Sequence, residues 1–150
     1  MKRAATPAIL AALTVLTVGV ITEAQQQSKL FKIGYLANGP NRSLDNSKKA
    51  LRALGYIEGK NIVIEYRFSE GKLDRFPALA EELVRLKVDL IVAIGTSPAL
   101  AARNATRTIP IVFTSGGDPV TVGLVDSLAH PGGNLTGFSN ITSELVGKRL

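Results

Sequence analysis

The sequence predicts an α/β fold in which a parallel sheet is flanked by helices. From residue 31 onward, short apolar runs alternate four times with segments whose apolar residues recur at helical spacing. Two of the runs, 88–94 and 109–113, are almost unbroken, which is typical of strands covered on both faces. Parallel neighbours need crossover connections, and the helical segments between the runs supply them.

Five strands are predicted, over residues 31–37, 61–68, 88–94, 109–113 and 135–139. The first strand ends in a dense turn signal at 38–41. The second alternates apolar and polar residues, which gives it one wetter face. The third and fourth are the two buried runs, and the fifth follows the helix-breaking segment Pro131-Gly132-Gly133.

Helices are predicted between the strands, over residues 44–54, 74–86, 99–105 and 120–129, and another begins at 143. Gly55 is the expected stop of the first, and Asp74 is expected to cap the second. The third has Ser97 as its expected N-cap and Pro98 at its first position. Asp118 and Pro119 repeat this arrangement before the fourth.

Composition excludes several classes of function. The chain has no Cys and one His, which excludes a disulfide framework, a zinc ribbon and a Cys nucleophile and argues against a His-based metal site. The net charge of +6 comes from scattered Lys and Arg, with three Tyr and five Phe for stacking, so no nucleic-acid partner is expected. Neither a phosphate loop nor a dinucleotide fingerprint occurs, so no cofactor and no metal are expected.

Residues 1–24 have the pattern of a secretory signal peptide. Lys2 and Arg3 precede the uncharged segment 4–21, and the small-x-small tripeptide Thr22-Glu23-Ala24 follows it. A membrane anchor is the alternative, because the uncharged segment would reach about 27 Å as a helix. Pro7 and the many Ala and Thr residues favour cleavage. The predicted location of the mature protein is therefore the periplasm.

Ligands of open parallel sheets bind beyond the carboxyl ends of the strands. The loops at that edge contain the candidate ligand-binding residues Asn38, Thr96, Ser97, Asp118 and Pro119. The free N–H groups at the third helix, with the hydroxyls of Thr96 and Ser97, could hold a carboxylate or a phosphate. Asp118 could accept hydrogen bonds from an ammonium or hydroxyl group. For Ser97 and Asp118, a helix cap without ligand is an equally good interpretation.

An enzymatic alternative uses the same segment. Gly95-Thr96-Ser97-Pro98-Ala99 is close to the G-x-S-x-G motif of α/β hydrolases, and Asp118 and His130 follow in the hydrolase order. Pro98 argues against this alternative, because the residue after the nucleophile supplies an oxyanion-hole N–H that proline does not have. A small exported hydrolase with Ser97 as its nucleophile is thus the second hypothesis, and we expect no enzyme.

Several motifs occur together and in order: Phe31-Lys32-Ile33-Gly34-Tyr35-Leu36, Leu54-Gly55-Tyr56-Ile57-Glu58-Gly59-Lys60-Asn61, Gly95-Thr96-Ser97-Pro98-Ala99, Gly117-Asp118-Pro119-Val120 and His130-Pro131-Gly132-Gly133-Asn134. With them, residues 31–150 resemble the exported substrate-binding proteins of ABC transporters of the tryptophan/tyrosine type. The resemblance implies a type I periplasmic-binding fold, with two α/β lobes that close on a ligand.

The same resemblance implies a domain layout and partners. Residues 25–140 would form the N-terminal lobe, and 141–150 would begin a second lobe. The ligand would be a small solute such as an aromatic amino acid, and the protein partner an ABC permease in the membrane. Repressor-like regulators share the fold, but here a signal segment stands where they have a DNA-binding helix-turn-helix.

Overall fold

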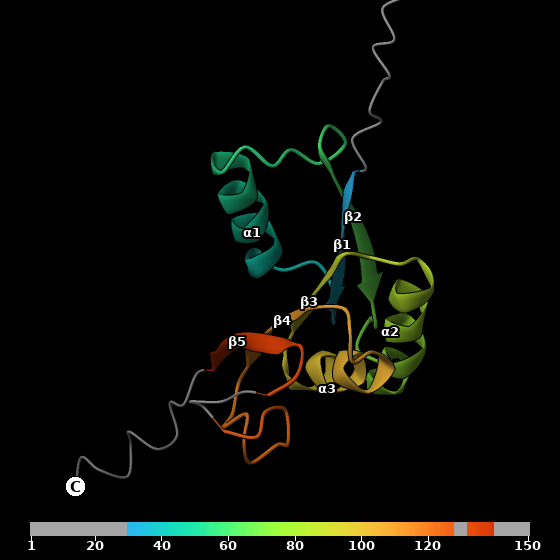
Figure 1. Ribbon diagram of the computed structural model, residues 1–150, viewed down its shortest axis with the longest axis vertical. Helices are drawn as coiled ribbons and strands as arrows, with labels where there is room; N and C mark the ends of the chain where they lie inside the picture. Colours follow the sequence, from blue (N-terminus) through green and yellow to red (C-terminus); the bar gives the residue numbers. More distant parts are fainter. Residues whose placement is uncertain (1–29, 128–131, 140–150) are drawn as a thin grey trace, which may run out of the picture.

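The computed structural model describes residues 30–127 and 132–139 (Figure 1). The strands are β1 Phe31–Ala37, β2 Ile62–Phe68, β3 Leu90–Ile94, β4 Ile111–Ser115 and β5 Leu135–Ser139. The helices are α1 Arg42–Ala53, α2 Phe76–Arg85, α3 Thr96–Ala105 and the short 3-10 helix η1 Leu73–Arg75. The strands form one sheet in the order β2-β1-β3-β4-β5, and every neighbouring pair is parallel. The predicted fold class is therefore confirmed.

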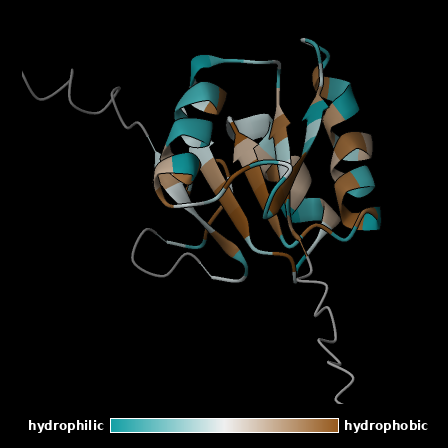
Figure 2. Cartoon of the chain, turned by 90° about the horizontal axis from the view of Figure 1, so that it is seen from above, coloured by the Kyte–Doolittle hydropathy of each residue, from teal (hydrophilic) through white to brown (hydrophobic). Residues whose placement is uncertain are grey.

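Helices cover both faces of the sheet: α1 lies on one side, and α2 and α3 lie on the other (Figure 1). Successive side chains of β3 point to opposite faces of the sheet. Ile91 and Ala93 are buried in the cluster that α2 and α3 form, whereas Val92 packs beside Leu44 of α1. Figure 2 shows the apolar residues concentrated in the strands, with hydrophilic residues on the outer sides of the helices.

The larger core lies between the sheet and the pair α2–α3. Phe76 and Leu83 of α2 are 2% and 0% exposed there. A Cβ atom on Gly34 of β1 would lie 2.9 Å from the Leu83 Cδ1 atom, so α2 packs this close only because the strand has a glycine at that position.

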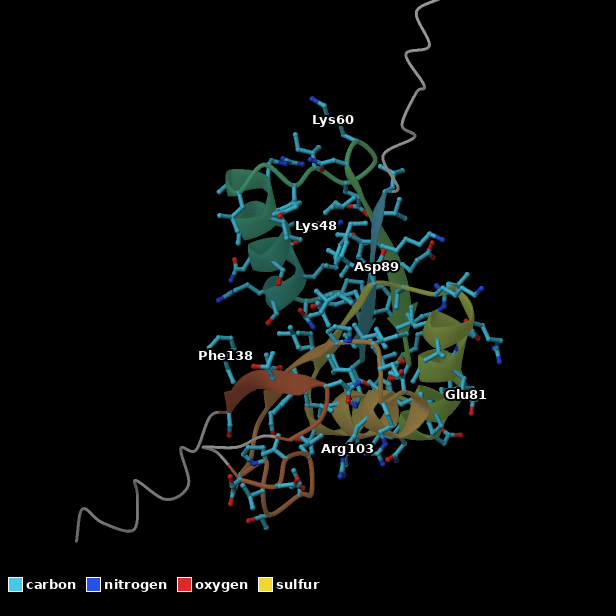
Figure 3. All side chains as sticks on the ribbon, in the orientation of Figure 1. Lys48, Lys60, Glu81, Asp89, Arg103 and Phe138 are labelled. Atoms are coloured by element: carbon cyan, nitrogen blue, oxygen red, sulfur yellow. The ribbon has the colours of Figure 1, made fainter. Side chains whose placement is uncertain are left out.

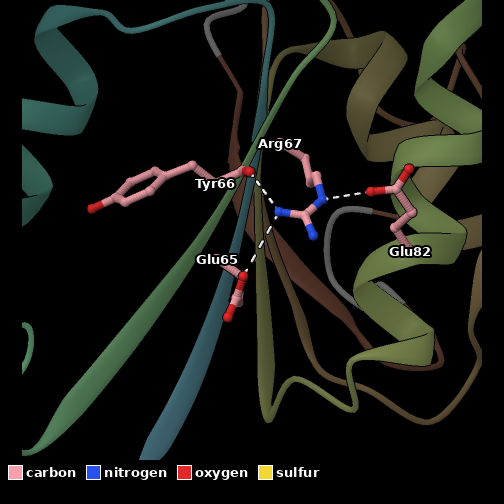
Figure 4. A network of polar contacts seen from close by, with 4 residues as sticks. All are labelled: Glu65, Tyr66, Arg67 and Glu82. Carbon is pink, nitrogen blue, oxygen red and sulfur yellow. Dashed lines mark hydrogen bonds and ion pairs between the residues drawn. The ribbon is translucent and has the colours of Figure 1, made fainter.

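The edge strand β2 is joined to α2 by charged side chains (Figure 4). The Arg67 Nε atom donates to the Glu82 carboxylate at 2.7 Å, and its Nη1 atom donates to the Tyr66 carbonyl at 2.8 Å. Glu65 lies 3.7 Å from the same Nη1 atom. Charged residues on an exposed edge also discourage pairing with a strand of another molecule.

The helix predicted over 120–129 is not present in its described part, 120–127, which forms turns. Gly123 has a φ of 71°, which ends any helical continuation, and its N–H donates to the Val120 carbonyl at 2.9 Å. Asp118 caps this turn instead of a helix. Leu124 and Val125 are nevertheless buried, so the segment still covers the core.

The start of α3 also differs from the prediction. The helix begins at Thr96, and its N-cap is Gly95, whose φ of 110° suits glycine. Ser97 is therefore not the N-cap but a residue of the first turn, and Pro98 occupies the third helical position instead of the first. Proline is tolerated there because the N–H groups of the first turn have no partner within the helix.

Smaller differences concern other element boundaries. Asp74 lies in η1 and makes no capping hydrogen bond, and Arg75 is the N-cap of α2. Strands β3 and β4 each begin two residues later than predicted. For β4 the residue before the strand is Pro110, which has no N–H for the ladder.

The predicted signal peptide, 1–24, and the predicted start of a second lobe, 141–150, lie outside the described residues. Among the helices that the structure does describe, none is both long and apolar enough to cross a membrane.

Candidate functional site

Parallel pairing brings the carboxyl ends of all five strands to the same side of the sheet, the carboxyl edge. The residues that follow these ends include Asn38 after β1, Ser69 after β2 and Thr96 after β3, while Ser115 and Ser139 end β4 and β5. The candidate residues predicted from the sequence all belong to the loops or helix starts at this edge.

Asn38 joins the first two loops. Its Oδ1 atom accepts a hydrogen bond of 2.6 Å from the Ser69 hydroxyl, and its carbonyl accepts one of 2.8 Å from the Glu70 N–H. The Asn38 residue is exposed, and its amide nitrogen makes no hydrogen bond to a residue within the described ranges. That nitrogen can therefore donate to a ligand.

Thr96 and Ser97 open α3, both half-buried at the edge. The Thr96 hydroxyl lies 3.2 Å from the Ser115 hydroxyl of the neighbouring strand. The Ser97 hydroxyl has no hydrogen-bond partner among the described residues. With the unpaired N–H groups of the first turn, it forms a place where a negatively charged group is favoured.

Asp118 follows β4 at the same edge, but its carboxylate is used locally. It accepts from the Thr121 hydroxyl at 2.7 Å and from the Val120 N–H at 3.0 Å. These donors, the Thr121 hydroxyl first, lower the pKa of Asp118 and favour its charged form. Pro119 is buried beneath it and lines a cavity of about 220 Å³ with Phe113 and Ser139.

Two residues at this edge, Ser115 and Ser139, are not among the candidate residues predicted from the sequence. The buried Ser115 hydroxyl bonds both the carbonyl and the N–H of Gly117, at 3.0 and 3.3 Å, and the Ser139 hydroxyl donates to the same carbonyl at 2.7 Å. Serine is common in loops, so composition gives no sign of either. Their proximity follows from the register of β4 with β5, in which Ser115 and Ser139 are partners, and the sequence does not specify that register.

The apolar cavities lie elsewhere. One of about 290 Å³ lies between α1 and the sheet and is lined mainly by aliphatic side chains such as Leu51, Val92 and Val112. A neighbouring cavity of about 310 Å³ shares Leu51 and is bordered by Phe31 and Tyr56. The walls of both cavities are mostly apolar, although Tyr35, Ser47 and Lys48 also line the first, whereas several hydrogen-bonding groups converge at the carboxyl edge and could orient a charged solute.

The hydrolase hypothesis, and the expectation that no metal is bound, can be compared with this geometry. The residue after Ser97 is Pro98, which has no N–H for an oxyanion, and the predicted third hydrolase residue, His130, lies outside the described residues. Within 30–127 and 132–139, no three His, Cys, Asp or Glu side chains are placed to hold a metal ion.

Comparisons with known proteins agree with the resemblance found in the sequence. Residues 39–149 match the model of the family described as ABC transporter substrate binding protein. A tyrosine-binding protein of Clostridioides difficile (strain R20291) is 41% identical over 126 residues, which are 81% of this chain and 36% of that protein. The chain thus spans little more than a third of this curated relative.

Solved structures give the same result for the fold. A ligand-free, open substrate-binding protein with adhesive properties from Clostridium difficile superposes with a TM-score of 0.68 at 38% identity, over 73% of this chain and 39% of that one. An ABC domain in complex with L-Trp from Streptococcus pneumonia superposes with a TM-score of 0.63 at 32% identity, over 73% and 38%. By family model, sequence and fold, the chain belongs to the ABC transporter substrate-binding proteins.

Proposed function

We propose that this chain is a solute-binding component of an ABC importer that binds an amino acid, such as an aromatic one, at the carboxyl edge of its sheet. The observation that carries the proposal is the start of α3, where unpaired N–H groups and the Ser97 hydroxyl stand beside the Thr96–Ser115 pair. The relatives support the ligand class, since one is named a tyrosine-binding protein and another was solved with L-Trp.

The ligand would be held by its two charged groups. Its carboxylate would take hydrogen bonds from the N–H groups of Thr96 and Ser97 and from the Ser97 hydroxyl, because helix N-termini favour negative charge. Asp118, with Pro119 fixing its loop, would attract the ammonium. The Asn38 amide nitrogen would donate a further hydrogen bond to the ligand. A second lobe would close over this half and hold the ligand in a cleft between lobes.

The remaining parts of the proposal concern the cell. Residues 1–24 would direct export to the periplasm, 25–140 would form the N-terminal ligand-binding lobe, and 141–150 would begin the second lobe. A permease in the membrane would receive the ligand, and the protein itself would catalyse no reaction. Ester hydrolysis that Ser97→Ala abolishes would instead establish the hydrolase.

Export can be measured directly. Expressed in a Gram-negative host, the protein is expected in the periplasmic fraction with a new N-terminus near Gln25, because the signal peptide is removed at the small-x-small site. N-terminal sequencing of the fractionated protein decides the matter. Full-length protein retained in the membrane fraction would show that residues 1–24 are an anchor.

Two substitutions test the site. Ser97→Ala removes a donor to the carboxylate, and we expect binding of L-phenylalanine to weaken by about 0.5–3 kcal/mol. Asp118→Ala should weaken the binding of amino acids more than that of analogues without the ammonium, because only the amino acids carry the positive charge. NMR titration of the chain measures both effects.

Thr108→Val is the matched control, since this exposed hydroxyl lies before β4, at the opposite edge of the sheet. It should leave affinity unchanged. Unchanged affinity in Ser97→Ala and Asp118→Ala as well would show that the ligand binds elsewhere.

A further inference from the structure

We propose that the Thr96 hydroxyl faces the ligand only as a hydrogen-bond acceptor, because a chain of hydroxyls behind it fixes the direction of its proton. The Thr96 hydroxyl would then contact the ammonium of the ligand and not its carboxylate, and Ser115 would be the positioning residue that enforces this choice. The inference rests on the proposed function and adds to it which group of the solute each hydroxyl recognises.

Ser115 is the centre of the chain of hydroxyls. Its oxygen lies 3.0 Å from the Gly117 carbonyl oxygen, 3.3 Å from the Gly117 nitrogen and 3.2 Å from the Thr96 hydroxyl oxygen. A serine hydroxyl has one proton and two lone pairs. The carbonyl can only accept, so the 3.0 Å contact is favourable only if Ser115 gives its proton to Gly117.

In its two remaining contacts, the Ser115 hydroxyl oxygen must then be the acceptor. The Gly117 N–H supplies one, and the Thr96 hydroxyl supplies the other. Ser115 is 5% exposed, so water has little access to reverse this arrangement. The Thr96 proton is therefore used inside the protein.

Ser139 supports the same direction from the next strand. It is the register partner of Ser115, and its hydroxyl donates to the Gly117 carbonyl at 2.7 Å. The carbonyl thus takes two protons on its two lone pairs and holds the loop of Gly117 against both strand ends. The loop that carries Asp118 is fixed by the same bonds.

This arrangement has a consequence for specificity. Thr96 is half-buried and presents only lone pairs toward a ligand, so it repels a carboxylate and attracts a group with N–H protons. The Ser97 hydroxyl has no described partner and keeps its proton for a carboxylate. The two neighbouring hydroxyls would therefore distinguish the two ends of an α-amino acid.

The test compares L-phenylalanine with 3-phenylpropanoate, which lacks only the ammonium, in NMR titrations of the chain. We expect Thr96→Val to weaken L-phenylalanine about tenfold, as loss of one hydrogen bond to a charged group does, and to leave 3-phenylpropanoate unchanged or tighter. Thr96→Ser should restore the wild-type preference. Ser115→Ala should release the Thr96 proton, so that the two affinities approach each other.

The outcomes separate this inference from the proposed function. Equal weakening of both ligands by Thr96→Val, or weakening of 3-phenylpropanoate alone, would show that Thr96 donates to the carboxylate and would overturn the inference, while the site would stand. If neither compound binds the wild-type chain, both this inference and the proposed function fail. Thr108→Val should behave as wild type. Thermal melting checks that Ser115→Ala folds. If it does not fold, the affinities of Thr96→Val and Thr96→Ser test the inference.

Discussion

The 150-residue chain alone is expected to bind an aromatic amino acid with a dissociation constant in the millimolar range. Binding pockets usually cover about 70–90% of a small ligand, whereas one sheet edge can contact only one side of it. Several hydrogen bonds of roughly 1 kcal/mol each would be missing, and every 1.4 kcal/mol is about tenfold in affinity. Titration calorimetry with L-phenylalanine and L-tryptophan measures the constant.

The longer relatives give the reference for this expectation, because the chain matches 36% of the tyrosine-binding protein. Micromolar, saturable binding by the chain alone would contradict it. Such a result would mean that another surface completes the pocket, and light scattering at the titration concentration would show whether a second copy supplies it.

Phe76→Ala is expected to lower the free energy of unfolding by about 3–5 kcal/mol, the usual cost of emptying a buried phenylalanine site. Phe76 is 2% exposed and begins α2, which packs with α3 to form the larger core. A loss of this size is a large part of the stability of a single domain. Urea unfolding monitored by circular dichroism measures it.

Phe138→Ala is the matched control. The same side chain projects from β5 and is 78% exposed, so its removal should change stability by no more than about 0.5 kcal/mol (Figure 3). Equal losses in the two variants would show that α2 does not pack on the sheet as described, or that Phe138 is covered in solution.

The strands could be predicted from the sequence because their signal is long and redundant. Buried runs such as 88–94 leave few alternatives to a covered parallel strand, and the observed β3 lies within that range. The boundaries depend on single backbone groups, which hydropathy patterning does not report. At β4, Pro110 has no N–H to donate, and the strand begins only after it.

The segment after β4 shows where periodicity fails. Residues 120–127 have enough apolar residues for a helix, and two of them, Leu124 and Val125, are indeed buried. The positive φ of Gly123 and the hydrogen bonds of Asp118 to its own turn nevertheless favour a compact turn. Local side-chain hydrogen bonds of this kind compete with helix formation and leave no periodic trace in the sequence.

The candidate site was predicted in part. Thr96, Ser97 and Asp118 lie at the carboxyl edge as expected, since parallel topology alone places the loops there. Ser115 and Ser139 required the register of β4 with β5, which the sequence does not contain. The Asp118 carboxylate bonds its own turn, so its role toward a ligand stays a prediction.

Backbone amide shifts of the chain, followed during titration with L-phenylalanine, test the central proposal most directly. Binding at the carboxyl edge predicts saturable shifts at Thr96, Ser97, Gly117 and Asp118, with smaller ones near Asn38. Shifts confined to the apolar cavity between α1 and the sheet, or no saturable shift at any amide, would contradict the proposal that this edge binds an amino acid.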